Sequence, residues 1–203
     1  LDSAIAAVSE EADVSVNPNE AYFNRGGAYV HTEQYDYAVQ DFNKAIELGY
    51  EPLSHAYYNR GIAYQEQEKY EQAIQDYNKA IELGYEPLSH AYNNRGAAYQ
   101  EQEKYAQAIQ DYNKAIELDE TNTYAYNNRG VAYQEQGKYE QAIQDYTRAI
   151  ELDHDPLSHA YYNRGIAYQE QEKYAQAIQD YNQAIELDEV YAYAYNNRGV
   201  AYE

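Results

Sequence analysis

The stretch AYYNRGIAYQEQEKYEQAIQDYNKAIEL, from Ala56 to Leu83, decides how this chain folds. Almost the same string returns from Ala160 to Leu187, where only Ala175 and Gln183 differ from their counterparts. Its Asn-Arg-Gly element occurs six times in 203 residues, with glycines 34 or 35 residues apart: Gly26, Gly61, Gly96, Gly130, Gly165 and Gly199. A period of this length indicates an array of similar structural repeats.

Each repeat has the pattern of two helices joined by a turn. In the first half of the quoted stretch, Tyr57, Gly61 and Tyr64 follow the i, i+4, i+7 spacing of one helix face. A set that starts at Ala73 follows the same spacing in the second half, and the Glu-Lys-Tyr between the two halves breaks the phase. Because so short a helical hairpin cannot bury its face alone, we expect neighbouring hairpins to stack into an all-α solenoid of antiparallel helix pairs.

Glycine and proline mark the connections between repeats. Gly49 and Gly84 follow second helices, where a left-handed residue commonly ends a helix. Prolines suited to a helix entrance come shortly after three of the second helices, at Pro52, Pro87 and Pro156.

The order of large residue, glycine, tyrosine, alanine, aromatic and alanine resembles the tetratricopeptide repeat. The resemblance covers residues 19–203 and implies a right-handed superhelical solenoid, with repeats at 19–53, 54–88, 89–122, 123–157 and 158–191 and a partial repeat at 192–203. The leucine that usually precedes the glycine is arginine here, which suggests an Asn-Arg-Gly subtype. Residues 1–18 are interpreted as a degenerate second helix or an N-terminal cap.

The charge balance limits the partners. The chain has 14 Lys and Arg against 35 Asp and Glu, a net charge of −21. Nucleic acid and anionic membrane surfaces need clustered basic residues, so both are excluded as partners, and an RNA-binding pentatricopeptide interpretation is disfavoured. The absence of cysteine removes disulfides and thiol chemistry. A basic partner fits better, and a soluble, cytoplasmic protein is the default expectation.

We expect no enzyme activity, cofactor or metal site. No nucleophile-and-base arrangement stands out from the repeat itself. Histidines recur at three helix starts, but one repeat apart they are too distant to share an ion; they are His55, His90 and His159. The chain contains no methionine and is interpreted as a fragment or a processed product.

One asparagine position recurs in every first helix and is the clearest functional signal. The resemblance places first helices along the concave groove of the superhelix, where a row of amides could grip an extended peptide backbone, since an amide both donates and accepts. These ladder asparagines are Asn24, Asn59, Asn94, Asn128, Asn163 and Asn197. They resemble asparagine ladders found in this family.

Other positions on the first helices give the expected groove its character. A recurrent acidic row consists of Glu66, Glu101, Glu135 and Glu170. Tyrosines expected on the exposed side are Tyr58, Tyr124, Tyr162 and Tyr193. The family's carboxylate clamp needs lysines beside the asparagine, but those places hold Phe23, Tyr58, Asn93, Asn127 and Tyr162. We therefore expect a protein-interaction scaffold for an extended, neutral-to-basic peptide, and not for an acidic C-terminal tail.

Several alternatives stay open from the sequence. The asparagines could bond only between neighbouring helices. The array could be a regulatory or substrate-docking part of a larger enzyme. It could also be a self-assembling module, in which residues 192–202 of one molecule pack head-to-tail against residues 1–14 of the next.

The recurrent arginines predict structural ion pairs with an aspartate that recurs in each second helix. Antiparallel pairing of the two helices brings each aspartate near the arginine of the same or the adjacent repeat, and removing one partner of a truly buried pair costs roughly 3–5 kcal/mol. The arginines are Arg25, Arg60, Arg95, Arg129 and Arg164, and the aspartates are Asp41, Asp76, Asp111, Asp145 and Asp180.

Overall fold

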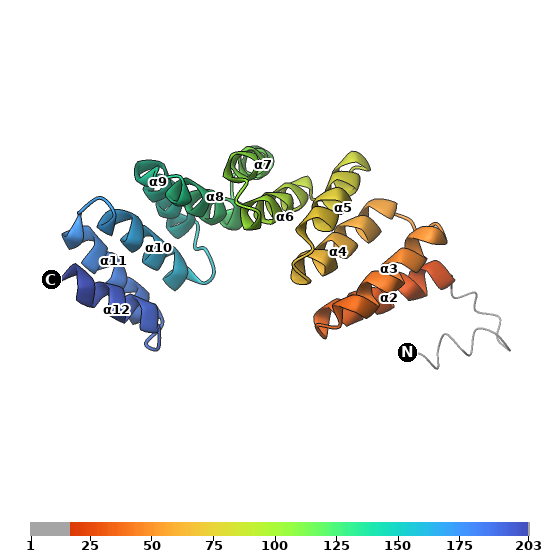
Figure 1. Ribbon diagram of the computed structural model, residues 1–203, viewed down its shortest axis with the longest axis horizontal. Coiled ribbons are helices and arrows are strands. Elements are labelled where there is room, and N and C mark those ends of the chain that lie inside the picture. The colour runs from red at the N-terminus through yellow and green to blue at the C-terminus, as the bar shows by residue number, and fades with distance from the viewer. Residues whose placement is uncertain (1–16, 203) are drawn as a thin grey trace. The chain divides into compact units, whose positions relative to one another are not determined.

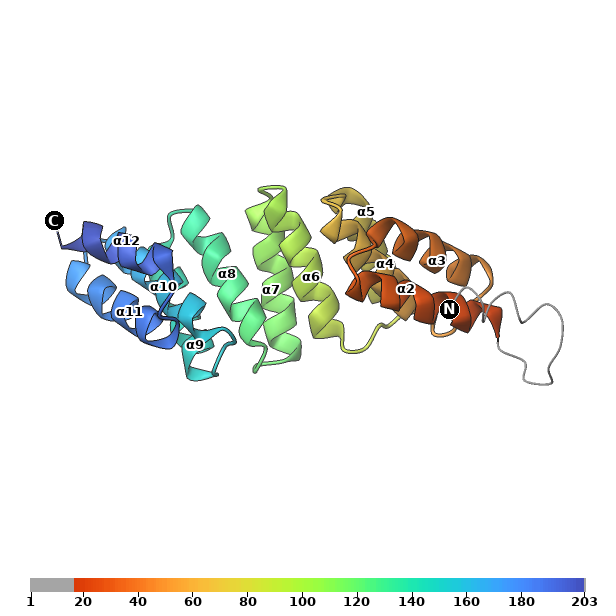
Figure 2. The same ribbon diagram turned by 90° about the horizontal axis from the view of Figure 1, so that it is seen from below.

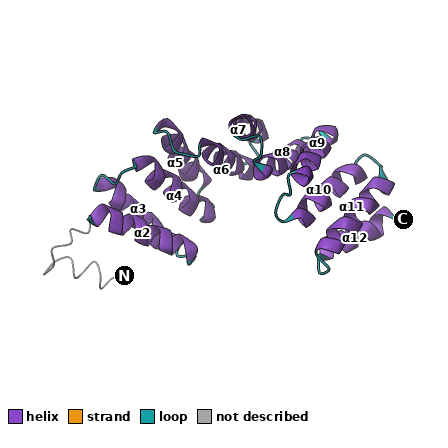
Figure 3. Cartoon of the chain, turned by 180° about the vertical axis from the view of Figure 1, so that it is seen from behind, coloured by secondary structure: helices purple, strands orange, loops and turns teal. Residues whose placement is uncertain are grey.

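The computed structural model describes residues 17–202, which form eleven α-helices and, within that range, no strand (Figures 1 and 3). The chain divides into two compact units, Leu1–Gln102 and Glu103–Glu203. The first unit contains α2 (Pro18–His31), α3 (Tyr35–Glu47), α4 (Leu53–Glu66), α5 (Tyr70–Glu82) and α6 (Leu88–Glu101). The second contains α7 (Tyr105–Leu118), α8 (Thr123–Glu135), α9 (Tyr139–Glu151), α10 (Leu157–Gln169), α11 (Tyr174–Leu187) and α12 (Ala192–Ala201).

The predicted fold class, an all-α array of antiparallel helix pairs, is confirmed. The handedness of the superhelix stays a prediction. The second helix or cap predicted in residues 1–18 falls on residues outside the described range, apart from Asn17 and Pro18, where α2 begins. The head-to-tail contact predicted for residues 1–14 lies outside that range too.

Within each unit, helices pack in sequence order. Four complete hairpins are formed by α2 with α3, α4 with α5, α8 with α9, and α10 with α11. Each second helix also contacts the next first helix of its unit, as α3 does α4 and α9 does α10 (Figure 2). The first helices contact one another as well: α2 with α4, α4 with α6, α8 with α10, and α10 with α12. In each unit they therefore form a continuous surface, which we call the first-helix face.

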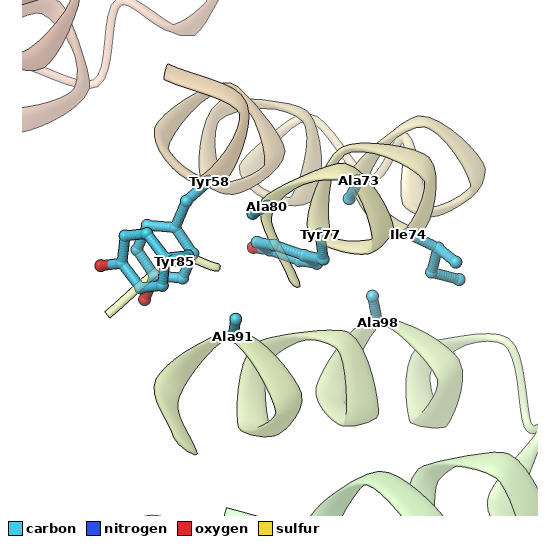
Figure 4. Close-up of a cluster of buried hydrophobic side chains, with 8 residues drawn as sticks. All are labelled: Tyr58, Ala73, Ile74, Tyr77, Ala80, Tyr85, Ala91 and Ala98. Carbon is cyan, nitrogen blue, oxygen red and sulfur yellow. The ribbon is translucent and has the colours of Figure 1, made fainter. Parts of the chain in front are cut away.

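The close approach within a hairpin depends on glycine. A Cβ added to Gly61 would lie 2.8 Å from Cε1 of Tyr77, whose side chain is fully buried on α5. Gly26, Gly130 and Gly165 meet the corresponding aromatic ring in the same way. On its other side, α5 places Tyr77 between small residues, with Ala91 and Ala98 of α6 facing it (Figure 4). The core therefore alternates one large ring with several alanines.

The left-handed stops predicted after second helices are confirmed. Gly49 and Gly84 both have φ of +71°. Each glycine comes immediately after the C-cap residue of its helix, which is Leu48 for α3 and Leu83 for α5.

The recurrent arginine joins the two helices of its own repeat. In the second repeat, Nε and Nη2 of Arg60 donate to the two carboxylate oxygens of Asp76, each at 2.7 Å. The same bidentate pair joins Arg25 to Asp41, Arg129 to Asp145 and Arg164 to Asp180. These arginine side chains are 15–18% exposed and the aspartates 6–7%. The pair expected between Arg95 and Asp111 would span the two units and stays a prediction.

The remaining guanidinium nitrogen reaches back to the preceding repeat, a contact that the sequence analysis missed. Nη1 of Arg60 donates to Oδ1 of Asn43 on α3 at 2.5 Å. The equivalent acceptors for later arginines are Asn78, Asn113, Thr147 and Asn182. The Arg60 guanidinium also lies 5.2 Å and 5.8 Å from the ring centroids of Tyr57 and Tyr64. One side chain thus connects three helices.

Aromatic residues that follow second helices pack back onto the first helix of the same repeat. Ring-centroid distances are 4.1 Å for Tyr50 on Phe23, 4.0 Å for Tyr85 on Tyr58 and 5.0 Å for Tyr191 on Tyr162. In the fourth repeat the same two positions hold His154 and Asn127. His154 instead packs edge-on against Tyr124 of α8, at 5.0 Å. It is 4% exposed, and its Nδ1 has no hydrogen-bond partner among the described residues.

Two adjacent glycines in α2 should respond oppositely to alanine. A Cβ at Gly26 would lie 2.8 Å from the Phe42 ring, so Gly26→Ala should lower the free energy of unfolding by roughly 1–3 kcal/mol. A Cβ at Gly27 would meet nothing within 4 Å, so Gly27→Ala should raise it by about 0.5–1 kcal/mol through helix propensity. Urea unfolding measures both, and a loss at Gly27 equal to that at Gly26 would refute the packing argument.

His154 should make stability depend on pH. Desolvation, together with the positive potential of His159, holds the pKa of His154 below its ordinary value, and Asp155 opposes this shift. The unfolded chain, with a histidine pKa of about 6.5, therefore binds the proton first as pH falls. The free energy of unfolding should decrease below about pH 6.5 and be unaffected by His154 above about pH 7.5.

The matched variant is His154→Tyr, which installs the residue found at Tyr50 and Tyr85. Between pH 7.5 and 5, its thermal midpoint should fall less than that of the wild type. His159→Gln, at an exposed position, should retain most of the wild-type pH dependence. Equal pH dependence in the wild type and the His154→Tyr variant would show that His154 does not carry this effect.

Candidate functional site

The ladder asparagines all lie on first helices. Asn24, Asn59 and Asn94 belong to α2, α4 and α6 in the first unit, and Asn128, Asn163 and Asn197 belong to α8, α10 and α12 in the second. Asn24 is exposed and the others are half-buried. Because neighbouring first helices contact one another, successive asparagines of one unit occupy equivalent positions on one first-helix face.

Most ladder asparagines use one amide donor inside the protein. Asn94 donates to the Tyr58 hydroxyl at 2.9 Å, and Asn197 donates to the Tyr162 hydroxyl at 3.1 Å. Asn163 donates to Oδ1 of Asn127 at 3.3 Å. These bonds join first helices of consecutive repeats, as the local-bonding alternative expects. They leave other hydrogen-bonding capacity of the amides unused, so they do not exclude a ligand.

Asn59 differs because the acceptor is missing. Tyr58 accepts from the asparagine of the next repeat, and the residue at the same position one repeat before Asn59 is Phe23, which has no hydroxyl. Asn59 donates instead to the backbone oxygen of His55 at 2.8 Å. The residue that precedes one ladder asparagine therefore decides where the next asparagine donates. A comparison of repeats could have found this signal, since Phe23, Tyr58, Asn127 and Tyr162 share one position.

The expected exposure of Tyr58 is wrong. Its side chain is only 9% exposed, because Tyr85 stacks on it with the rings tilted by 15° (Figure 4). Burial raises the pKa of Tyr58 well above its usual range, so its hydroxyl loses the proton even less readily than that of an exposed tyrosine. Tyr162 is half-buried in the corresponding contact with Tyr191. Tyr124 and Tyr193 are 55% and 70% exposed, as the sequence predicts.

Exposed carboxylates lie near the C-terminal ends of the first helices. Glu66, Glu101, Glu135 and Glu170 are all exposed. The Tyr35 hydroxyl donates to Glu66 at 3.5 Å, and the Tyr139 hydroxyl donates to Glu170 at 3.2 Å. Burial, followed by the charge of Glu170, raises the pKa of Tyr139. Two members of the acidic row, Glu66 and Glu170, thus accept from a tyrosine of the preceding repeat, and all four stay open to solvent.

Within residues 17–202, no three histidine or acidic side chains are grouped closely enough to hold a metal ion. His55 and His159 pack against Tyr85 and Tyr191, at ring distances of 4.9 Å and 5.3 Å. None of the described helices combines the length and the apolar character that a bilayer crossing requires.

Comparison with known proteins gives matches to the repeat family and to several solved structures. Tetratricopeptide repeat profiles match residues 20–48, 54–83, 89–122, 123–156 and 158–189. YrrB, described as a TPR protein with an unusual peptide-binding site, superposes with a TM-score of 0.71 at 24% identity, covering 98% of this chain and 97% of YrrB. A tetratricopeptide repeat protein from Parabacteroides merdae ATCC 43184 gives 0.77 at 20% identity, covering 91% and 72%.

The first TPR of Spaghetti (RPAP3), bound to the HSP90 peptide SRMEEVD, gives a TM-score of 0.54 at 29% identity, covering 56% of this chain and 89% of that one. No curated protein matches the sequence. The repeat profiles cover more than half of the chain, in register with the helical hairpins described above. The chain therefore belongs to the tetratricopeptide repeat family.

Proposed function

We propose that the chain is a protein-interaction scaffold whose first-helix faces bind an extended, neutral-to-basic peptide segment of a partner. The observation that carries this proposal is an amide at the same position of every first helix. The Oδ1 atoms of Asn59, Asn163 and Asn197 accept no hydrogen bond from the described residues, so they remain available to peptide N–H groups. We further propose that arginine in place of the usual leucine marks an Asn-Arg-Gly subtype of the family.

The charge of the chain favours a ligand that is not acidic. The net charge is −21, and the row from Glu66 to Glu170 is exposed. The peptide solved with RPAP3 is acidic, whereas the positions beside the ladder asparagines here hold aromatic residues or asparagine instead of lysine. YrrB supports peptide binding as such, since its structure is described as containing a peptide-binding site.

A synthetic library of twelve-residue peptides tests the proposal. The wild-type chain should select extended, neutral-to-basic sequences. The triple variant Asn59→Ala, Asn163→Ala, Asn197→Ala should bind the selected peptide at least about tenfold more weakly, because one or two lost hydrogen bonds account for that factor. Circular dichroism of the variant provides the folding control.

Salt provides a second readout on the same peptide. Affinity should fall between 50 and 500 mM sodium chloride, because exposed charges are screened. Selection of acidic peptides only, or a triple variant that is folded and binds as tightly as the wild type, would contradict the proposal.

A further inference from the structure

The first-helix faces are not uniform, because the position before the ladder asparagine changes between repeats. In the second and fifth repeats it holds Tyr58 and Tyr162, whose rings pack against Tyr85 and Tyr191. This position therefore has no side-chain amide in those two repeats. In the third, fourth and partial sixth repeats it holds Asn93, Asn127 and Asn196. The surface between α8 and α10 therefore carries amides where the surfaces around Tyr58 and Tyr162 carry packed rings.

The contact between Asn127 and Asn163 leaves both partners with unused capacity. Oδ1 of Asn127 accepts the Asn163 donor at 3.3 Å. Among the described residues, nothing accepts from Nδ2 of Asn127 and nothing donates to Oδ1 of Asn163. The pair thus offers a donor and an acceptor together, which complements the C=O and N–H groups of an extended peptide.

An exposed aromatic ring lies beside this amide pair. Tyr124 precedes Asn127 by three residues, so both lie on one face of α8. Tyr124 is 55% exposed, and the edge contact with His154 supports its ring. In the second and fifth repeats this helix position holds histidine, and the tyrosine follows the second helix instead, in the pairs His55 with Tyr85 and His159 with Tyr191. The exchange places the phenol of the fourth repeat on the first-helix face.

The ring and the charge of the chain suit a cationic side chain. Cations bind the faces of aromatic rings, and the protein already does this internally, where Arg164 lies 5.4 Å from the Tyr161 centroid. Burial lowers the pKa of His154, so this neighbour is neutral at pH 7 and does not repel a cation. The net charge of −21 favours the same ligand.

We infer that Tyr124, Asn127 and Asn163 form the specificity-determining subsite of the second unit, which binds one main-chain peptide group and an adjacent lysine or arginine side chain of an extended ligand. The inference rests on the proposed function and narrows it. Asn94, whose amide bonds to Tyr58 and Asn93, contributes little to binding on this view.

The decisive variant is Asn127→Tyr, which installs the residue found at Tyr58 and Tyr162 and removes the free amide. The probe is the strongest-binding peptide that the wild type selects from the twelve-residue library, together with versions in which each lysine or arginine is alanine. Asn127→Tyr should bind the probe about tenfold or more weakly, and Asn94→Ala less than about twofold. Tyr124→His, the residue found at His55 and His159, should reduce the affinity difference between the probe and one of its alanine versions.

Thermal unfolding of each variant shows that the fold persists. Unchanged binding by Asn127→Tyr, or an equal loss in Asn94→Ala, overturns the subsite while a weakened Asn triple variant still supports the proposed function. For each alanine version, the affinity of the probe divided by the affinity of that version is measured on the wild type and on Tyr124→His. If this ratio is the same on both proteins for every version, the assignment of a cationic side chain to Tyr124 is wrong. If the wild type selects no peptide, the proposed function and the subsite both fall.

Discussion

A guanidinium group held between three helices is the constraint on which the repeat depends. Arg60 pairs with Asp76 of its own hairpin, donates to Asn43 of the preceding one and lies between two tyrosine rings. Burial raises the pKa of Asp76, and the pair with Arg60 only partly offsets this shift, so the desolvation of the carboxylate is the larger effect. The pair therefore contributes less net stability than its short distances suggest, but either partner left alone would be a buried, uncompensated charge. Such a contact specifies the angle and register of neighbouring helices more than it adds to the free energy of unfolding.

The residues that pack the hairpins are nearly the same in every repeat, so the positions that differ between repeats indicate where the repeats differ in function. Glycine at position 61 and its equivalents sets the hairpin spacing, and the buried ring of Tyr77 and its equivalents fills it. Where that ring is Tyr77, Tyr146 or Tyr181, its hydroxyl donates to a glutamine of the first helix; where it is Phe42, the glutamine position holds Val30. The buried ring and its hydrogen-bond partner on the first helix thus change together from one repeat to another. The same logic applies on the first-helix face, where the residue before each ladder asparagine decides how much hydrogen-bonding capacity remains for a partner protein.

The helical periodicity predicts much of this arrangement because contacts within a hairpin repeat at fixed intervals. The pairing of Arg60 with Asp76 follows from antiparallel packing of two helices whose phases are visible in the sequence. The contact from Arg60 to Asn43 does not, because it depends on the angle between consecutive hairpins. The burial of Tyr58 could not be predicted for a related reason. The connection after α5 places Tyr85 on the Tyr58 ring, and helix spacing does not predict the path of a connection. His154 escaped notice because its position varies along the chain: it holds Tyr50 and Tyr85 in the first two repeats but Glu120 and Glu189 in the third and fifth.

A mutant cycle on Arg60, Asp76 and Asn43, followed by urea unfolding, tests most directly whether the arginine is the structural link between repeats. Arg60→Ala and Asp76→Ala should each lower the free energy of unfolding by roughly 3–5 kcal/mol, and the double variant by far less than their sum. Asn43→Ala should cost about 1 kcal/mol in the wild type and nothing once Arg60 is absent. Lys79→Ala, which breaks the exposed pair with Glu82, serves as a control with no measurable loss. Additive losses at Arg60 and Asp76, or an Asn43 effect that persists without Arg60, would contradict this account.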